Sequence, residues 1–523
     1  MPPRRSIAAL AVLCTLASCA EAPPPSYDEA LATAAAALGT DDLDGLGPVV
    51  IHASGTLDKW AEGQGHSPDA PSPGPYRETL AFDPDGRVVW DYEEERFDGT
   101  RERFGESYTS DTLRTLLIHD VGIALPMRLS PGDGGARRLL RRLPHLLVAE
   151  LRDGESAGPV ERPAAGELRV AGRLATGEQV TLALDEATGL VRSASYEATL
   201  PGRGPARVAW MWDDYRDVGG GVMVPFAYSS RVGERPYTSM TVDSVATGVE
   251  DAFEPPDGLR TVDTADDSAD EEEEPAPLER RELAEGVYRV PQVRGGFAPL
   301  VVEFDTFLVA VDAPASFPLL GQLPASETDP GPSFGWASER FAEALDGWWP
   351  DKPVAYLVLT HHHEDHVGGV RAFVAGGTTV LASDATLQAV RRLVDLQASE
   401  VDDRLASEPA PLRAEAVREQ RTITDGRRSI DILPVGENPH AEGMLVVGLP
   451  GLNALYVSDL VTPAPLERYP GENHAPLDRF FGEWLAGRGL RPDSIWSMHG
   501  SRTITREHLA RLADESDSST EPS

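Results

Sequence analysis

The chain has 523 residues, 41% of them hydrophobic, and a formal net charge of −38 at pH 7. Because this length exceeds what a single hydrophobic core normally holds, we expect two or three domains with sizeable cores. The strongly acidic balance argues against nucleic acids and anionic membrane surfaces as binding partners.

The N-terminus has the pattern of a secretory signal. Arg4 and Arg5 precede an apolar run over 7–14, and the signal ends in Leu-Ala-Ser-Cys at Cys19. A run of this length suits a signal peptide and is too short to span a bilayer. The last four residues resemble a bacterial lipobox, in which Cys19 is lipidated and becomes the first residue of the mature chain. An ordinary signal peptide with a chance cysteine is the alternative.

The lipobox resemblance implies an exported protein that is lipid-anchored in the bacterial cell envelope. It predicts a signal peptide at residues 1–19 and a tether at 20–26. By analogy with lipoprotein sorting, Ala20 favours the outer membrane or the cell surface. The chain has two cysteines, Cys14 and Cys19, so the mature protein can form no internal disulfide and offers a metal no thiolate from its C-terminal half.

Residues 27–259 are predicted to form a β-rich N-terminal domain. An Ala-rich helix over 28–38 comes first, and apolar–polar alternation interrupted by turn residues follows. The expected strands include residues 77–82, 87–92, 179–184, 190–192, 208–212 and 222–226. Repeated hairpins of this kind indicate a broad, curved antiparallel sheet.

Part of this segment resembles the half-barrels of periplasmic lipoprotein carriers. The resemblance rests on Asp-Tyr-Arg-Asp-Val-Gly-Gly at 214–220 and Val-Pro-Phe at 224–226. It implies that the sheet holds an acyl chain or a lipid, whereas the alternative is a sheet that packs against the other domain. The histidines of this segment lack the spacing of metal ligands, and we expect ordinary surface or core histidines at His52, His66, His119 and His145.

Two polar segments are predicted to be disordered. Residues 260–282 contain a run of acidic residues followed by prolines, so they cannot bury enough apolar surface to fold alone. They form a linker that divides the chain into two folding units. The tail at 512–523, rich in Ser, Asp and Glu, is the second such segment.

The most informative stretch is His-His-His-Glu-Asp-His at 361–366. It lies between a predicted buried strand at 355–360 and a helical segment at 370–374, so it occupies a strand-to-helix loop. In an extended backbone alternate residues face the same side, which directs His361 and His363 to one point and Asp365 and His366 to a neighbouring one. Imidazole and carboxylate ligands suit zinc. A solvated polar loop that happens to be rich in histidine is the alternative.

This stretch resembles the H-x-H-x-D-H signature of the metallo-β-lactamase-fold hydrolases. Three further residues match the family's remaining motifs in order along the chain: His440, Asp459 after an apolar strand, and His499. The resemblance covers residues 283–511. It implies an α/β fold, a C-terminal αββα metallo-β-lactamase sandwich preceded by the mainly antiparallel β domain.

Residue by residue, the resemblance implies two Zn²⁺ ions per chain. One would be held by His361, His363 and His440, the other by Asp365, His366 and His499, with Asp459 bridging both. Two such ions share and deprotonate a water, giving a hydroxide nucleophile, and polarise the substrate oxygen. Asp365 would also act in catalysis by orienting that hydroxide. His362 and Glu364 are expected to lie outside the ligand set.

The resemblance favours a small-molecule ester, thioester, lactone or similar bond as the substrate. Family members that hydrolyse β-lactams generally lack an aspartate at the position of Asp459. Two alternatives remain open: a mononuclear iron sulfur dioxygenase of the same fold, and a lipid- or lipoprotein-binding module that acts through the N-terminal sheet. Nothing in the sequence indicates an oligomeric state.

Two other features near the motif carry predictions. The insertion at 387–423 is expected to form helices at 390–396 and 413–421, which would either cap the active site or elaborate the surface. His474 lies between Asp459 and His499 in the chain and is a candidate for the pocket lining.

Overall fold

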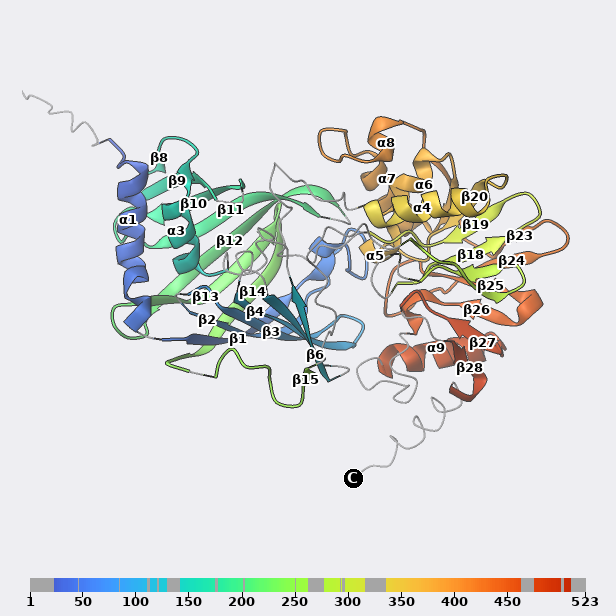
Figure 1. Ribbon diagram of the computed structural model, residues 1–523, viewed down its shortest axis with the longest axis horizontal. Coiled ribbons are helices and arrows are strands. Elements are labelled where there is room, and N and C mark those ends of the chain that lie inside the picture. Colours follow the sequence, from blue (N-terminus) through green and yellow to red (C-terminus); the bar gives the residue numbers. More distant parts are fainter. Residues whose placement is uncertain are drawn as a thin grey trace, which may run out of the picture.

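The computed structural model describes residues 23–508, apart from gaps at 46, 84, 111–112, 120–121, 129–141, 175–176, 201–202, 250, 262–276, 292, 294–296, 316–334, 462–474 and 500–502. The predicted signal peptide, the C-terminal tail, His474 and most of the acidic linker therefore lie outside the described residues. The described chain forms a β-rich N-terminal part and an α/β C-terminal part, which lie side by side (Figure 1).

The N-terminal part contains one large sheet. Its strands are β1 (Val49–Leu57), β2 (Gly74–Phe82), β3 (Val88–Glu95), β4 (Arg101–Ser110), β5 (Leu113–Ile118), β6 (Ile123–Arg128), β7 (Glu155–Ser156), β8 (Glu161–Ala164), β9 (Glu167–Arg173), β10 (Gln179–Asp185), β11 (Val191–Leu200), β12 (Gly204–Asp217), β13 (Met223–Val232), β14 (Arg235–Thr247) and β15 (Arg260–Thr261). The order is β15-β6-β5-β4-β3-β2-β1-β14-β13-β12-β11-β10-β9-β7, with β8 also paired to β9. Neighbours pair antiparallel except β15 with β6, which confirms the predicted antiparallel sheet.

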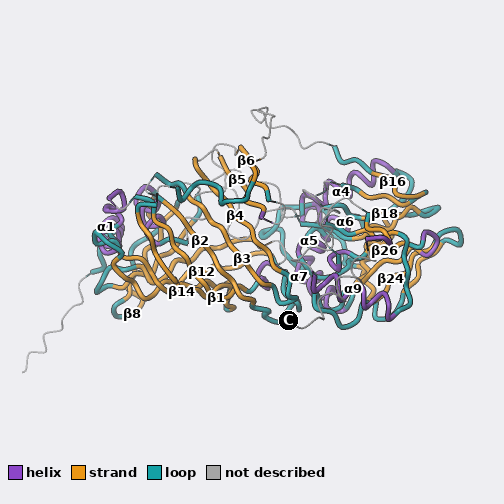
Figure 2. Tube along the Cα trace, turned by 90° about the horizontal axis from the view of Figure 1, so that it is seen from below, coloured by secondary structure: helices purple, strands orange, loops and turns teal. Residues whose placement is uncertain are grey.

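Two helices, α1 (Tyr27–Leu38) and α3 (Pro144–Asp153), cover one face of this sheet near its β9–β11 end (Figure 1). Helix α1 lies at the end of the molecule that is remote from the C-terminal part (Figure 2). Strand β10 alternates regularly, with Val180, Leu182 and Leu184 buried, because successive side chains of a strand point to opposite faces. These side chains share a core with Leu31 of α1 and Leu147 of α3.

The C-terminal part contains two smaller sheets. The first has the order β16 (Arg281–Ala284), β17 (Val287–Arg289), β18 (Leu300–Glu303), β19 (Leu308–Val311), β20 (Val354–Val358), β21 (Thr379–Ala382) and β22 (Arg413–Ala416). The second has the order β23 (Arg421–Thr424), β24 (Ser429–Pro434), β25 (Leu445–Leu449), β26 (Ala454–Tyr456), β27 (Ser494–Trp496) and β28 (Ile504–Thr505). The helices are α4 (Trp336–Trp348), α5 (Glu364–Val367), α6 (Val370–Ala375), α7 (Asp384–Val394), α8 (Arg404–Ser407) and α9 (Ala475–Gly487).

The buried side chains divide this part into four layers. Val309 and Leu381 of the first sheet share a core with Ile432 and Val447 of the second, so the two sheets face each other. The outer face of the first sheet packs against α4, α6 and α7, and the outer face of the second packs against α9. This arrangement confirms the predicted αββα sandwich.

The insertion after the motif differs from its prediction in one respect. Residues 390–394 of the helix expected at 390–396 belong to α7, which ends at Val394, but the prediction of a helix at 413–421 is wrong. Residues Arg413–Ala416 form β22, which pairs parallel with β21 at the edge of the first sheet. The helix-forming residues of this stretch adopt a strand because the free edge of β21 offers backbone hydrogen bonds, and tertiary pairing outweighs local propensity.

Among the residues that the structure describes, no helix has both the length and the apolarity needed to cross a bilayer.

Candidate metal centre

The predicted ligands are delivered by strand ends of both C-terminal sheets. His361 and His363 follow β20, and Asp459 follows β26 in a short 3-10 turn, Ser458–Leu460. His499 follows β27, and His440 lies in the connection between β24 and β25. Strands β20, β26 and β27 end at the same edge of the sandwich, where parallel pairs collect functional loops.

Two glycines let the motif fold tightly onto the first sheet. After the extended His363, residues Glu364–Val367 form the single turn α5, which brings Asp365 and His366 back toward His361. A Cβ atom on Gly369 would lie 2.1 Å from Ser338 Oγ, and one on Gly368 would lie 2.6 Å from the Glu364 carbonyl oxygen. The Gly-Gly pair therefore allows a contact that a larger residue would prevent.

All seven predicted ligands come together, in two groups that share one residue. The first group is His361, His363, His440 and Asp459, and the second is Asp365, His366, Asp459 and His499. Within each group the ligand atoms all lie within 4.8 Å of one another. Every member is buried except the half-buried His499.

Asp459 divides its two oxygens between the groups. Its Oδ2 lies 3.3 Å from His440 Nε2 and 3.6 Å from His361 Nε2. Its Oδ1 lies 3.0 Å from His366 Nε2 and 3.0 Å from His499 Nε2. This is the geometry of a carboxylate that can bridge two cations.

Hydrogen bonds on the far side of the imidazoles assign their tautomers. His366 Nδ1 lies 3.0 Å from Asp312 Oδ2, and an ionised carboxylate can only accept. His361 Nδ1 lies 3.2 Å from Thr360 Oγ1, whose own proton is donated to Asp312 at 2.9 Å. Both rings therefore carry their proton on Nδ1 and present a bare Nε2 to the site.

Several buried polar atoms in the site lack a hydrogen bond to any described residue: His361 Nε2, His366 Nε2, His440 Nε2 and Asp365 Oδ1. Buried polar atoms are rarely left without a partner, because desolvation without compensation is costly. Imidazole nitrogens and carboxylates converging with unused lone pairs suit a divalent cation such as zinc. The residues present therefore fit the metals that the family resemblance implies.

The ionisable groups of the site are strongly perturbed. Burial, together with the neighbouring His366 and His440, holds the pKa of His361 and that of His363 well below the usual range. Burial also opposes protonation of His499, but Asp459 and Asp365 outweigh it and raise the His499 pKa to about 9. The pKa values of Asp365 and Asp459 fall well below the usual range, since adjacent histidines outweigh the effect of burial. Both carboxylates are therefore ionised at neutral pH.

The neighbours of the motif lie outside both groups. His362 is buried and turned away from the ligands, and its Nε2 donates to the Gly65 carbonyl at 2.8 Å. Glu364 is also buried and accepts a hydrogen bond from Gln64 Nε2 at 3.3 Å.

Sequence reasoning missed the N-terminal residues that touch the site. Asp98 lies 3.0 Å from His440, and His66 Nε2 contacts the backbone carbonyl of Asn438, two residues before His440, at 3.1 Å. These partners are separated by 342 and 372 positions in the chain. No local pattern marks contacts of such separation.

Residues 329–494 match the family model described as the metallo-beta-lactamase superfamily. The solved structures similar to this chain include the FIM-1 metallo-β-lactamase of Pseudomonas aeruginosa in a mono-zinc form, at 18% identity, TM-score 0.33, and 47% and 98% coverage of this chain and of that one. A metallo-β-lactamase from Pontibacter korlensis has 17% identity, TM-score 0.32, and 45% and 97% coverage. One from Hirschia baltica has 19% identity, TM-score 0.31, and 46% and 97% coverage. No curated protein matches the chain by sequence.

The family match spans the four-layer sandwich from α4 to the start of β27 and contains six of the seven clustered residues, His499 lying just beyond it. The C-terminal part of this chain is therefore a domain of the metallo-β-lactamase superfamily, with clustered histidines and aspartates able to bind metal.

Proposed function

We propose that this protein is a binuclear zinc hydrolase that cleaves an ester, thioester, lactone or similar bond in a small molecule. His361, His363 and His440 would hold one ion, and Asp365, His366 and His499 the other. Asp459 would bridge them.

The observation that carries this proposal is the position of Asp459. Each of its oxygens faces a different histidine pair, at 3.0–3.6 Å. A residue serving one cation would need a single oxygen directed at one group. The arrangement therefore favours two ions over one.

When bound, two zinc ions supply Lewis acidity at the substrate oxygen and lower the pKa of water. The chain's own contribution is to place a base beside them. Asp365 Oδ1 is buried and makes no hydrogen bond to a described residue, while Asp365 Oδ2 is held 3.3 Å from His499. The free oxygen is thus available to accept a proton from the attacking water and to orient it.

The exposure of the ligands indicates how a substrate would reach the site, and the bridging residue indicates the substrate class. The His499 side chain is 27% exposed, whereas those of the histidines opposite it are 0–3% exposed. Substrate would therefore approach from the side of His499 and meet both ions. The aspartate at position 459 favours esters, thioesters and lactones over β-lactams, as the family resemblance implies.

We also propose that the protein is exported and held in the bacterial cell envelope by a lipid on Cys19. Support for this comes from the lipobox-like sequence ending at Cys19.

The test is the zinc content of the purified full-length chain and of three ligand variants. We expect about two zinc ions per wild-type chain, the stoichiometry of two-metal hydrolases. His363→Ala and His499→Ala should each retain one ion, and Asp459→Ala should weaken both. Hydrolysis of model esters, thioesters and lactones should be lost in all three.

His52→Ala is the matched control, because His52 is an exposed histidine of β1 that hydrogen-bonds Thr79. It should keep both ions and full activity. One iron per chain would instead support a dioxygenase, and a wild-type protein without metal would refute the proposed site.

A further inference from the structure

Two segments of the N-terminal sheet lie against the metal centre. One is the loop 58–73, which joins β1 to β2, and the other is the turn 96–100, which joins β3 to β4. The loop is tied to the C-terminal part by backbone hydrogen bonding, since Glu442 N donates to the His66 carbonyl at 2.7 Å. These segments connect strands of the N-terminal sheet, whereas every residue of the two ligand groups lies in the C-terminal part.

The turn presents one carboxylate to a ligand. Asp98 Oδ2 lies 3.0 Å from His440 Nδ1, and Asp98 Oδ1 accepts from Thr100 N at 2.9 Å and from Thr100 Oγ1 at 2.6 Å. Since the carboxylate accepts only, His440 carries its proton on Nδ1 and directs its bare Nε2 into the first group. Asp98 is buried, and removing a carboxylate from water costs free energy. Docking of the two surfaces alone would not require a buried carboxylate at this position.

The loop presents a backbone carbonyl to a second ligand. The Gly65 oxygen accepts from His363 Nε2 at 3.1 Å as well as from His362 Nε2. A carbonyl oxygen cannot donate, so His363 is protonated on Nε2 and its Nδ1 is the nitrogen left for a metal. Two of the three histidines of the first group thus have their tautomer set by the N-terminal sheet.

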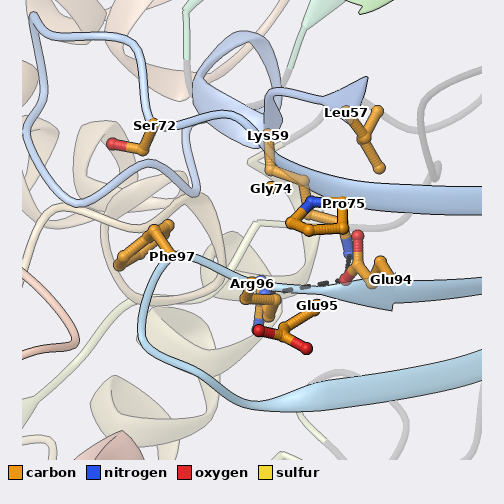
Figure 3. Close-up of a pocket in the computed structure, with 9 residues that line it drawn as sticks. All are labelled: Leu57, Lys59, Ser72, Gly74, Pro75, Glu94, Glu95, Arg96 and Phe97. Carbon is orange, nitrogen blue, oxygen red and sulfur yellow. Dashed lines mark ion pairs between the residues drawn. The ribbon is translucent and has the colours of Figure 1, made fainter. Parts of the chain in front are cut away.

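Charged side chains brace the turn and the loop. Figure 3 shows Lys59 and Arg96 directed at Glu94 in a small pocket behind the turn, with Lys59 Nζ 2.6 Å and Arg96 Nε 3.7 Å from its carboxylate. Arg96 also donates to Gln64 Oε1 at 2.6 Å, and Gln64 in turn donates to Glu364. Loop, turn and motif are therefore connected by a continuous chain of hydrogen bonds.

The outer end of the loop is fixed as well. Arg203 and Arg235 lie over the Trp60 ring, at 3.3 and 3.9 Å from its centroid. Arg392 of α7 pairs with Asp69 at 2.6 Å. These contacts hold the loop between the N-terminal sheet and helix α7 without involving a metal ligand.

We propose that the N-terminal sheet helps to form the metal centre by orienting two of its ligands. Asp98 is the positioning residue for His440, and the backbone carbonyl of Gly65 positions His363. This inference rests on the proposed metal site and goes beyond it, because it assigns the β-rich domain a role in metal affinity. Groups that orient metal-bound histidines typically change affinity about 10- to 100-fold when removed.

The test is zinc affinity of the full-length chain, measured by competition with a chromogenic chelator. In a His499→Ala background, where the first group alone holds zinc, Asp98→Asn should weaken binding about 10- to 100-fold. The amide keeps the shape but donates toward Nδ1, so it favours the wrong tautomer. In a His363→Ala background, where the second group remains, Asp98→Asn should change nothing. Asp98→Ala is a second variant for the case in which the amide is not accommodated.

Asp69→Ala is the control for docking, since it removes an interdomain ion pair that touches no ligand. It should leave zinc affinity unchanged in both backgrounds. Equal losses from Asp69→Ala and Asp98→Asn, or from both groups, would assign the contact to docking alone and overturn the inference. Unchanged affinity of the first group in Asp98→Asn and Asp98→Ala would overturn it as well. Absence of zinc from the wild-type chain would instead refute the proposed function.

Discussion

Replacing Asp312 tests the second group of ligands in the way that replacing Asp98 tests the first. It follows β19, is fully buried and adopts a left-handed backbone conformation at φ 67°. Its carboxylate accepts from Thr360 N at 2.8 Å and from His366 Nδ1 at 3.0 Å. Asp312→Asn keeps the side-chain shape and the acceptor for Thr360, but it turns an amide toward His366.

The size of the effect follows from the lost acceptor. With an NH₂ group facing Nδ1, His366 moves its proton to Nε2, the nitrogen that faces Asp459 and the proposed metal. Restoring the competent tautomer leaves two donors facing each other in a buried site, which costs about 1–3 kcal/mol. At about 1.4 kcal/mol per factor of ten, zinc binding should weaken about 5- to 140-fold.

The assay is the same chelator competition, run in the two single-site backgrounds. In the His363→Ala background Asp312→Asn should lower zinc affinity by that factor, and in the His499→Ala background it should not. Hydrogen exchange of residues 354–367 in metal-free protein should match the wild type, because the amide still accepts from Thr360. Equal loss in both backgrounds, or unchanged affinity with unchanged exchange, would refute the tautomer argument.

Two further predictions concern stability. Gly369→Ala places a Cβ 2.1 Å from Ser338 Oγ and 2.8 Å from the Pro314 carbonyl oxygen, so overpacking should destabilise the C-terminal domain by about 1–3 kcal/mol. Gly376→Ala is the control, because the nearest atom to its added Cβ is 3.4 Å away, and it should change the melting temperature little. Equal melting temperatures for the two variants in thermal unfolding would contradict the packing argument. Burial lowers the pKa of His145 from 6.5 to about 4. Between pH 6.5 and pH 4 the unfolded chain therefore binds a proton at His145 that the folded chain does not bind. The stability that neutral His145 contributes is fully present above pH 6.5 and is lost as pH falls toward 4. Between pH 7.5 and pH 5 this loss should lower the free energy of unfolding by about 2 kcal/mol. In urea titrations His145→Leu should remove this part of the pH dependence of the free energy of unfolding.

Much of the C-terminal domain follows from sequence because its signals are local. The histidines and carboxylates at 361–366 predict a metal site by their composition, and an apolar strand before Asp459 places a carboxylate at a strand end. The resemblance of these motifs to those of the metallo-β-lactamase-fold hydrolases then implies the sandwich, and the structure brings the seven residues together. Alternation in β10 likewise reports which face of the N-terminal sheet is buried.

What escaped prediction depends on long-range pairing. Residues 413–416 look helical locally and become a strand because β21 offers an edge. Asp98 and Gly99 look like ordinary hairpin-turn residues, and Gly65 lies in a loop with no distinctive pattern. Their relation to His440 and His363 exists only when the N-terminal sheet lies against the C-terminal part.

The contact between Asp98 and His440 also has a consequence for how the chain matures. It joins residues that are 342 positions apart in the chain, so we expect it to form late, after the sheets on both sides have folded. A folding intermediate with the C-terminal sandwich alone would have His440 and His363 free to adopt either tautomer. High-affinity metal capture would then report completed assembly, and a half-folded chain would release its metal instead of being trapped by it.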